Sequence, residues 1–334
     1  MMRDKMFGRT VSGFGSRAKR AASSPYVSLS AVNALTIDSD FATLQIDGSN
    51  FSFPTALAVG TDKLIVGTAG VLNLGGDTNL LSYNFNTSTS LSTGTASPTA
   101  GDMADDGSGN EQTTIRGMCF SFDGSYLYVA GQADSNRVIR FDLGTPYDIT
   151  SVTSQSNTAQ LGSAMNSLQG IAIIGDGTKF YAVRSTSGAV GQVIEYAMST
   201  PYDLTTLSTT RTVTAAYTGN FSGGFVVDMA IAPDGSSIII GSLGGSASAG
   251  YQTILDQWPL TNGDITPISG TSGRVSGNFS KNLGNTYDSV GDDSAVYSQG
   301  FNFNPGGDAL LVCSVHMDDG PSGSSNQWHV TRWT

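Results

Sequence analysis

The chain has 334 residues and a formal net charge of −11 at pH 7, and only 13% of its residues are charged. Glycine alone contributes 42 residues, and no long stretch places apolar residues at the i, i+3, i+4 spacing of an amphipathic helix. This composition disfavours a helical fold, is typical of short strands joined by many turns, and includes no run of roughly 18 apolar residues that would predict a membrane span.

Residues 1–23 form a basic segment that is rich in Gly, Ser and Arg and lacks the apolar run of a secretory signal. Such a segment cannot bury enough apolar surface to fold alone, so we predict an extended N-terminal arm that docks onto other proteins. Nucleic acid is disfavoured as a partner, because a handful of basic charges is weak evidence for it. The predicted anchoring residues are the six basic side chains of the arm: Arg3, Lys5, Arg9, Arg17, Lys19 and Arg20.

From residue 54 onward the sequence repeats one plan five times. Each unit begins with an alternating apolar run, a turn and a second apolar run, as in "RGMCFSFDGSYLYVAG" at 116–131. Gly and Asp tolerate the positive φ of a tight turn, so we predict that each unit begins with a β-hairpin. The other four predicted hairpins span residues 55–68, 169–184, 227–242 and 299–314.

A third strand follows each hairpin. The predicted third strands span residues 80–85, 137–143, 192–198, 253–260 and 326–333. All five have an aromatic residue at one aligned place, and large flat side chains there suit packing between neighbouring sheets. These aromatic residues are Tyr83, Phe141, Tyr196, Trp258 and Trp333. The two cysteines, Cys119 and Cys313, have no metal-like spacing and are predicted to be small buried residues.

A turn into a fourth strand follows, written "GTPYDI" (144–149) and "STPYDL" (199–204) in the second and third units. Proline presets φ to about −65° and the Asp side chain can hydrogen-bond to the local backbone, so this motif is typical of a turn. The fifth unit stops at Thr334, where the turn is due, while a partial copy, "SSPYVSL", occurs at 23–29. We therefore predict that residues 24–36 supply the fourth strand of the last unit.

Five four-stranded sheets, one of them built from both ends of the chain, describe a closed ring with only short, protected edges. The predicted fold is an all-β, five-bladed β-propeller of four-stranded blades, closed by an N-terminal strand. Its predicted parts are an arm at 1–23 and a propeller at 24–334. Within the propeller, 24–53 hold the closing strand and linker, and 54–334 hold the blades.

The pairing of a "PDGS" hairpin with an "STPYDL" turn resembles the repeats of β-propeller proteins encoded by bacteriophages. The resemblance extends over residues 24–334, with the motif intact in the second and third blades. It implies a virion protein made in the host cytoplasm, present in several copies in a symmetric assembly, at the tail, the collar or the capsid. It transfers no catalytic residue, because the matched positions form turns. The predicted function is therefore a non-enzymatic virion structural protein, anchored to other virion proteins through its arm.

Two alternatives stay open. One is a host-attachment module that binds a receptor or glycan through the two longest departures from the repeat, 271–298 and 316–326. The other is a metal-dependent propeller hydrolase or lyase with Asp228 as a channel acid, although the sequence has only two histidines and no GxSxG motif. The candidate ligand-binding residues for the first alternative are Tyr287, Tyr297, His316 and Met317.

Acidic loops are predicted on the face opposite the repeated turns, and the longest is "GDMADDGSGNE" at 101–111. Solvated loops are the simpler interpretation, but several carboxylates together could bind Ca²⁺, the one cofactor considered. The candidate calcium ligands are Asp102, Asp105, Asp106 and Glu111.

Overall fold

The computed structural model describes residues 44–46, 54–68, 80–84, 115–131, 137–161, 167–186, 190–216, 225–246, 250–265, 279–282, 296–316 and 327–334. Within these residues the chain forms β-strands and two short 3-10 helices, which confirms the all-β prediction. No helix in this part of the chain has the length and apolar character needed to cross a membrane.

The strands form five sheets, each built mainly of sequential antiparallel neighbours. The first blade consists of β2 (Pro54–Val59), β3 (Lys63–Thr68) and β4 (Leu80–Asn84). The second consists of β5 (Ile115–Phe120), β6 (Tyr126–Gly131), β7 (Arg137–Leu143) and β8 (Val152–Gln160). The third consists of β9 (Leu168–Ile173), β10 (Lys179–Thr186), β11 (Val190–Met198) and β12 (Leu207–Ala216).

The fourth blade has a divided outer strand. It consists of β13 (Phe225–Ile231), β14 (Ser237–Ser246) and β15 (Gly250–Thr261), with β16 (Asp264–Ile265) and β17 (Phe279–Asn282) both paired to β15. The fifth blade consists of β18 (Val296–Phe303), β19 (Leu310–His316), β20 (Gln327–Trp333) and β1 (Leu44–Ile46).

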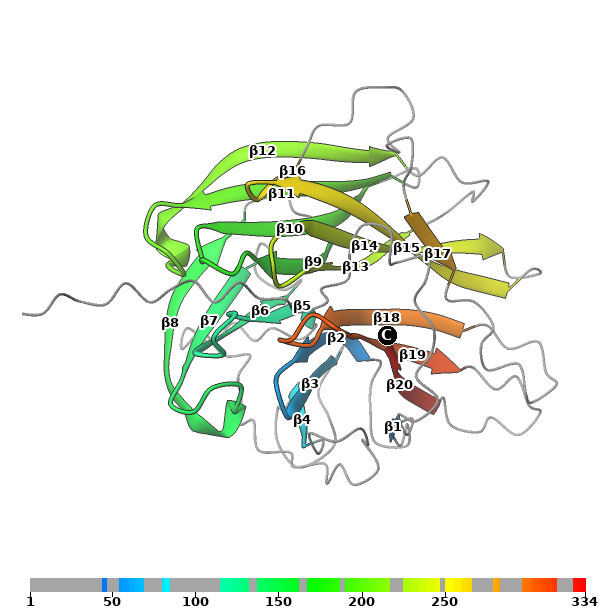
Figure 1. Ribbon diagram of the computed structural model, residues 1–334, viewed down its shortest axis with the longest axis horizontal. Coiled ribbons are helices and arrows are strands. Elements are labelled where there is room, and N and C mark those ends of the chain that lie inside the picture. Colours follow the sequence, from blue (N-terminus) through cyan, green and yellow to red (C-terminus); the bar gives the residue numbers. More distant parts are fainter. Residues whose placement is uncertain are drawn as a thin grey trace, which may run out of the picture.

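The blades close into a ring. The first strands contact one another in the order β2, β5, β9, β13, β18 and back to β2, and Figure 1 shows them gathered at the centre of the molecule. The architecture is thus a five-bladed β-propeller, as the repeats predict.

The clasp between the two ends of the chain is made by β1. This strand pairs antiparallel with β20, with Leu44 opposite Val330 and Ile46 opposite Trp328. It lies inside the predicted 24–53 segment but after residues 24–36, which fall outside the described residues along with the arm. An N-terminal strand therefore closes the fifth blade, in agreement with the prediction, and its described part is 44–46.

The aligned aromatic residues of the third strands are all buried between sheets. Trp258, for example, packs in one cluster with Tyr181 and Val183 of the preceding blade, and Phe141 packs with Ile65 of the first blade. Because each blade is apolar on both faces, burial of these rings holds neighbouring blades together. Both cysteines are free and buried, as predicted.

The hairpin turns have the geometry that their sequence predicts. Gly124, Gly177, Gly235 and Gly307 all have φ of about +70°, in the left-handed region that suits glycine. In the following turns, Asp148 and Asp203 each accept a hydrogen bond from the backbone N–H two residues on, at 3.0 Å. These aspartates cap the short 3-10 helices η3 (Ile149–Ser151) and η5 (Leu204–Thr206), and the chain then enters the fourth strand.

The "TPYD" turns also join one blade to the next, which turn chemistry alone does not predict. The Tyr202 carbonyl accepts hydrogen bonds from Tyr128 Oη (3.0 Å) and Arg140 (2.9 Å), both in the preceding blade. Tyr147 packs so tightly on Gly60 of the first blade that a Cβ on Gly60 would lie 2.6 Å from the Tyr147 Cβ. The tyrosine of the motif is therefore an inter-blade contact as well as a turn residue.

Candidate functional site

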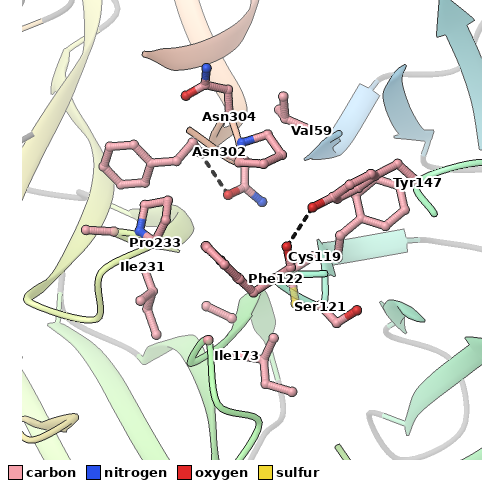
Figure 2. Close-up of a pocket in the computed structure, with 16 residues that line it drawn as sticks. Val59, Cys119, Ser121, Phe122, Tyr147, Ile173, Ile231, Pro233, Asn302 and Asn304 are labelled. Atoms are coloured by element: carbon pink, nitrogen blue, oxygen red, sulfur yellow. Dashed lines mark hydrogen bonds between the residues drawn. The ribbon is translucent and has the colours of Figure 1, made fainter. Parts of the chain in front are cut away.

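A shallow pocket lies at the centre of the ring, at the end of the blades where the repeated turns are (Figure 2). The cavity has a volume of about 60 Å³, room for a few water molecules, and it is open to solvent on one side. Every blade contributes the end of its first strand or the residues just beyond it. Lining residues from the five blades include Val59, Ser121, Phe122, Gly175, Pro233 and Asn304.

Asn302 forms the floor of this pocket, and its side-chain amide points toward the centre in Figure 2. The amide nitrogen donates to the carbonyls of Leu57 (3.3 Å) and Met118 (3.5 Å), while its oxygen accepts from the Phe303 N–H (2.9 Å). One side chain thus links the fifth, first and second blades, because β18, β2 and β5 supply these groups.

The first strands of neighbouring blades approach one another closely around the ring. A Cβ on Gly117 would lie 2.7 Å from the Ile171 nitrogen, and one on Gly300 would lie 3.1 Å from Ala56, both on neighbouring blades. Glycine at these places permits the close approach of backbones.

Asp228 occupies the place in β13 that glycine occupies in β5, β9 and β18. It is fully buried, and its two oxygens accept hydrogen bonds from the N–H groups of Met229 (2.8 Å) and Phe301 (3.0 Å). Burial raises the pKa of Asp228 well above its usual range. Both oxygens accept bonds from backbone groups, so Asp228 links the fourth blade to the fifth, and it is not among the described residues that line this pocket.

Phe122 and Tyr147 form one side of the pocket rim. Phe122 is 48% exposed, unusual for a large apolar side chain in this part of the protein, and its carbonyl accepts a 2.6 Å hydrogen bond from Tyr147 Oη. Tyr147 has a φ of 62°, which a bulky side chain rarely adopts, and its ring stands edge-on to Phe120 at 5.2 Å. Burial and the nearby Asp123 raise the pKa of Tyr147 to about 12, so the hydroxyl stays a proton donor at neutral pH.

The described lining offers no ionisable group that could act in catalysis near neutral pH. Cys119 lies at the base of the pocket, and burial raises the pKa of its thiol, which keeps it protonated and unreactive. No carboxylate, ammonium or guanidinium group belongs to the described lining. The lining can therefore bind an uncharged group through ring, amide, hydroxyl and carbonyl contacts.

Most residues that the sequence proposed as sites lie outside the described residues. These are the six basic residues of the arm, the calcium candidates Asp102, Asp105, Asp106 and Glu111, and the loop residues Tyr287 and Met317. The calcium, arm and loop assignments therefore stay predictions. Within the described part of the chain, no group of three or more His, Cys, Asp or Glu residues is placed to hold a metal ion.

Two of the proposed loop residues lie on strands. Tyr297 is in β18 opposite Val315, and His316 ends β19 opposite Val296, so the backbone register brings the two residues to adjacent rungs of the fifth blade. This end of the blade lies away from the hairpin turns that adjoin the pocket.

The sequence contains a signal for the pocket that the repeat analysis did not use. At the position before the turn aspartate, Phe122 stands where the third and fourth blades have Gly175 and Pro233. In "FNFNPGG", Asn302 interrupts a strand that is apolar at the same place in the other units. Each departure placed a polar or exposed residue in the pocket.

Comparisons with known proteins bear on the fold. No family model matches the chain, and no curated protein matches it. Among solved structures, a Bacteroides ovatus protein described as xyloglucan PUL GH43B is 12% identical with a TM-score of 0.51, covering 86% of this chain and 54% of that one. The chain thus spans about half the length of that protein, and at this identity the similarity shows the fold alone.

Two other solved structures are less similar. The Podospora anserina α-L-arabinofuranosidase PaAbf62A is 9% identical with a TM-score of 0.45, covering 89% of this chain and 96% of that one. The Pseudomonas aeruginosa periplasmic gluconolactonase PpgL is 14% identical with a TM-score of 0.37, covering 82% and 83%.

These comparisons correct two functional predictions. The propellers that resemble this chain are named as gluconolactonases and glycoside-acting enzymes, and none of those described above is a virion protein. The predictions of a virion structural protein and of a non-enzymatic function are therefore wrong. They failed because repeat motifs that form turns report the architecture and carry no information on the site. The resemblance to phage-encoded repeats itself stays a prediction.

Proposed function

We propose that the protein binds a carbohydrate at the turn-face pocket, which we define by Phe122, Tyr147, Asn302, Asn304 and Ser121. The observation that carries this proposal is the pairing of an exposed aromatic ring with uncharged polar groups in one open depression. A sugar has the same two properties, since its ring carries an apolar C–H face and a rim of hydroxyl groups. Pockets of this kind fix a ligand by apolar contact and orient it by a few polar groups.

The open mouth suits a ligand that is only partly enclosed. The cavity has room for one pendant group, while a ring lying on the exposed side of Phe122 would remain partly in solvent. Phe122 is held for this contact because its carbonyl is bonded to Tyr147 and its side chain packs on Gly175 of the next blade. A preorganised aromatic surface of this kind lowers the entropic cost of binding.

The described lining accounts for binding of a sugar. The pair of carboxyl groups about 5 to 10 Å apart that a glycoside hydrolase uses would have to come from residues outside the described lining. The name of the Bacteroides ovatus protein refers to a polysaccharide, which accords with the proposal, but the support for it is the pocket.

The test is titration calorimetry of the full chain with a panel of neutral oligosaccharides. Phe122→Ala should weaken binding of the best ligand about tenfold, about 1.4 kcal/mol, because one face of the ring loses its apolar partner. Val152→Ala is the matched control, since Val152 is the other exposed large apolar residue of the described chain and lies outside the pocket. No binding by any sugar, or equal loss in both variants, would overturn the proposal.

A further inference from the structure

We infer that the turn-face pocket selects its ligand by charge, preferring an amino sugar to the neutral sugar and excluding the corresponding uronic acid. This inference rests on the proposed function and names its ligand class. Two independent features of the described residues carry it: which hydrogen-bonding atoms of the pocket are still available, and which charges surround it.

The side-chain donors of the pocket are almost all used within the protein. Tyr147 Oη donates to the Phe122 carbonyl, Ser121 Oγ donates to Asp123 (2.8 Å), and both hydrogens of the Asn302 amide face backbone carbonyls. Asn304 donates one amide hydrogen to Asp308 (2.7 Å) and keeps one. What remains is mainly lone pairs on hydroxyl, amide and carbonyl oxygens, each of which can accept a further bond.

A pocket whose available groups are hydrogen-bond acceptors favours a ligand that donates hydrogen bonds. Hydroxyl and ammonium groups donate hydrogen bonds, whereas an ionised carboxylate or phosphate only accepts them. An acidic sugar would bring its charged oxygens against oxygens of the protein and would lose its hydration without compensation.

The charges around the pocket also favour a cationic ligand over an anionic one. Each blade has an exposed aspartate in its first turn, within three residues of a residue that lines the pocket, and these five form what we call the aspartate ring. Its members are Asp62, Asp123, Asp176, Asp234 and Asp308. Within the described residues none of them is ion-paired, because Lys63 pairs with Asp148 and Lys179 pairs with Asp264 and Glu195.

Asp123 of the ring remains ionised near neutral pH. For Asp123, burial raises the pKa, but hydrogen bonds from Ser125 and Ser121 outweigh this effect and the pKa is lowered overall. A depression surrounded by charges of one sign raises the local concentration of oppositely charged ligands and lowers that of like-charged ones, by tenfold or more at low salt. Among the described lining residues there is no cation that would offset this field.

The experiment takes the tightest neutral sugar from the calorimetry panel and compares it with its 2-amino and uronic acid analogues on the full chain. At low ionic strength we expect the amino sugar to bind best and the uronic acid about tenfold more weakly than the neutral parent. At about 1 M NaCl the Debye length falls to roughly 3 Å, so the contribution of the ring should disappear and the differences should shrink.

A variant with all five ring residues changed to Asn tests the source of the field. Asn keeps a side-chain oxygen for the turn hydrogen bonds, so the variant should bind the neutral sugar as before while the charge preference falls. Asp203→Asn is the matched control, because Asp203 accepts the same kind of turn bond but does not adjoin the pocket lining. If the fivefold variant fails to fold, the salt titration of the unmodified chain tests the inference, because a charge preference that persists at about 1 M NaCl would contradict it.

The outcomes separate the two proposals. Binding of the uronic acid within twofold of the neutral sugar at low salt would overturn the inference and leave the carbohydrate site standing. An unchanged charge preference in the fivefold variant would do the same. Failure of every sugar to bind would overturn both.

Discussion

Asp228 provides the sharpest test of how the ring is held together. Replacing it with Ala removes the acceptors of two buried backbone N–H groups, Met229 in its own strand and Phe301 on the neighbouring blade. The carboxyl packs directly against the neighbouring blade, since a Cβ on Gly170 would lie 2.4 Å from its oxygen. In the Ala variant both N–H groups would lose their acceptor within the protein.

An unpaired buried N–H costs about 1–3 kcal/mol, so the two together predict a loss of about 2–6 kcal/mol. For a domain of this size each kcal/mol lowers the melting temperature by roughly 2 °C, which gives a fall of about 4–12 °C. Differential scanning calorimetry and urea unfolding measure the change. Asp203→Ala is the control, because its turn is exposed and water can bond the N–H that it releases.

The loss should also depend on pH, with a definite sign. Burial raises the pKa of Asp228 in the folded state above the unfolded value of about 3.9, so the folded protein holds the proton more tightly. The stability that this carboxyl contributes is complete below the unfolded pKa and is lost as the pH rises through the folded pKa. The difference between wild type and Asp228→Ala should therefore be larger at pH 5 than at pH 8. Equal melting temperatures for Asp228→Ala and Asp203→Ala, or a difference that grows with pH, would refute this account.

Three further predictions concern the turns and the clasp. Gly177→Ala should lower the melting temperature by several degrees, because Gly177 has a φ of +69° and a Cβ there would lie 2.6 Å from the Tyr202 ring; Gly144→Ala, with no positive φ, should have a much smaller effect. Burial raises the pKa of Tyr147 and Tyr202 to about 12, so in an absorbance titration neither should ionise until about that pH. The stability that they contribute should fall between pH 10, the unfolded value, and pH 12. Ionisation near pH 10 would contradict their placement. Deleting residues 1–46 should expose the edge of β20 and cause aggregation, whereas a deletion that ends before β1 should leave a soluble ring, and equal solubility would contradict the clasp.

The sequence predicts those features of the fold that are local. The third strand predicted at 137–143 is β7 without change, because alternation of apolar residues and flanking turn residues define a strand by themselves. The positive φ of Gly124 follows from its place after Asp123 in the same way. The strand at 44–46 was not located, since three residues cannot show a period of two. Its pairing depends on β20, which lies at the other end of the chain.

The inter-blade role of the motif tyrosine also depends on tertiary structure. The residues that Tyr202 contacts, Tyr128 and Arg140, are more than 60 residues away in the sequence. The sequence "STPYDL" contains no information about these partners, so analysis of the motif alone predicts only a turn. The packing of one blade on the next decides what the exposed side of that turn touches.

The pocket could have been found from the sequence by a different use of the same alignment. In a closed ring, equivalent positions of the blades meet around the axis, so residues that are aligned in the repeat become neighbours in space. Ala58, Cys119, Ala172, Ala230 and Asn302 are equivalent, and the last of these reaches across the axis to bond two other blades. Residues that are alike in all five repeats maintain the architecture. A residue that differs from its equivalents at a position near the axis lies where all five blades meet. Departures from a propeller repeat near its first turn therefore indicate a binding site more directly than long loops at the rim do.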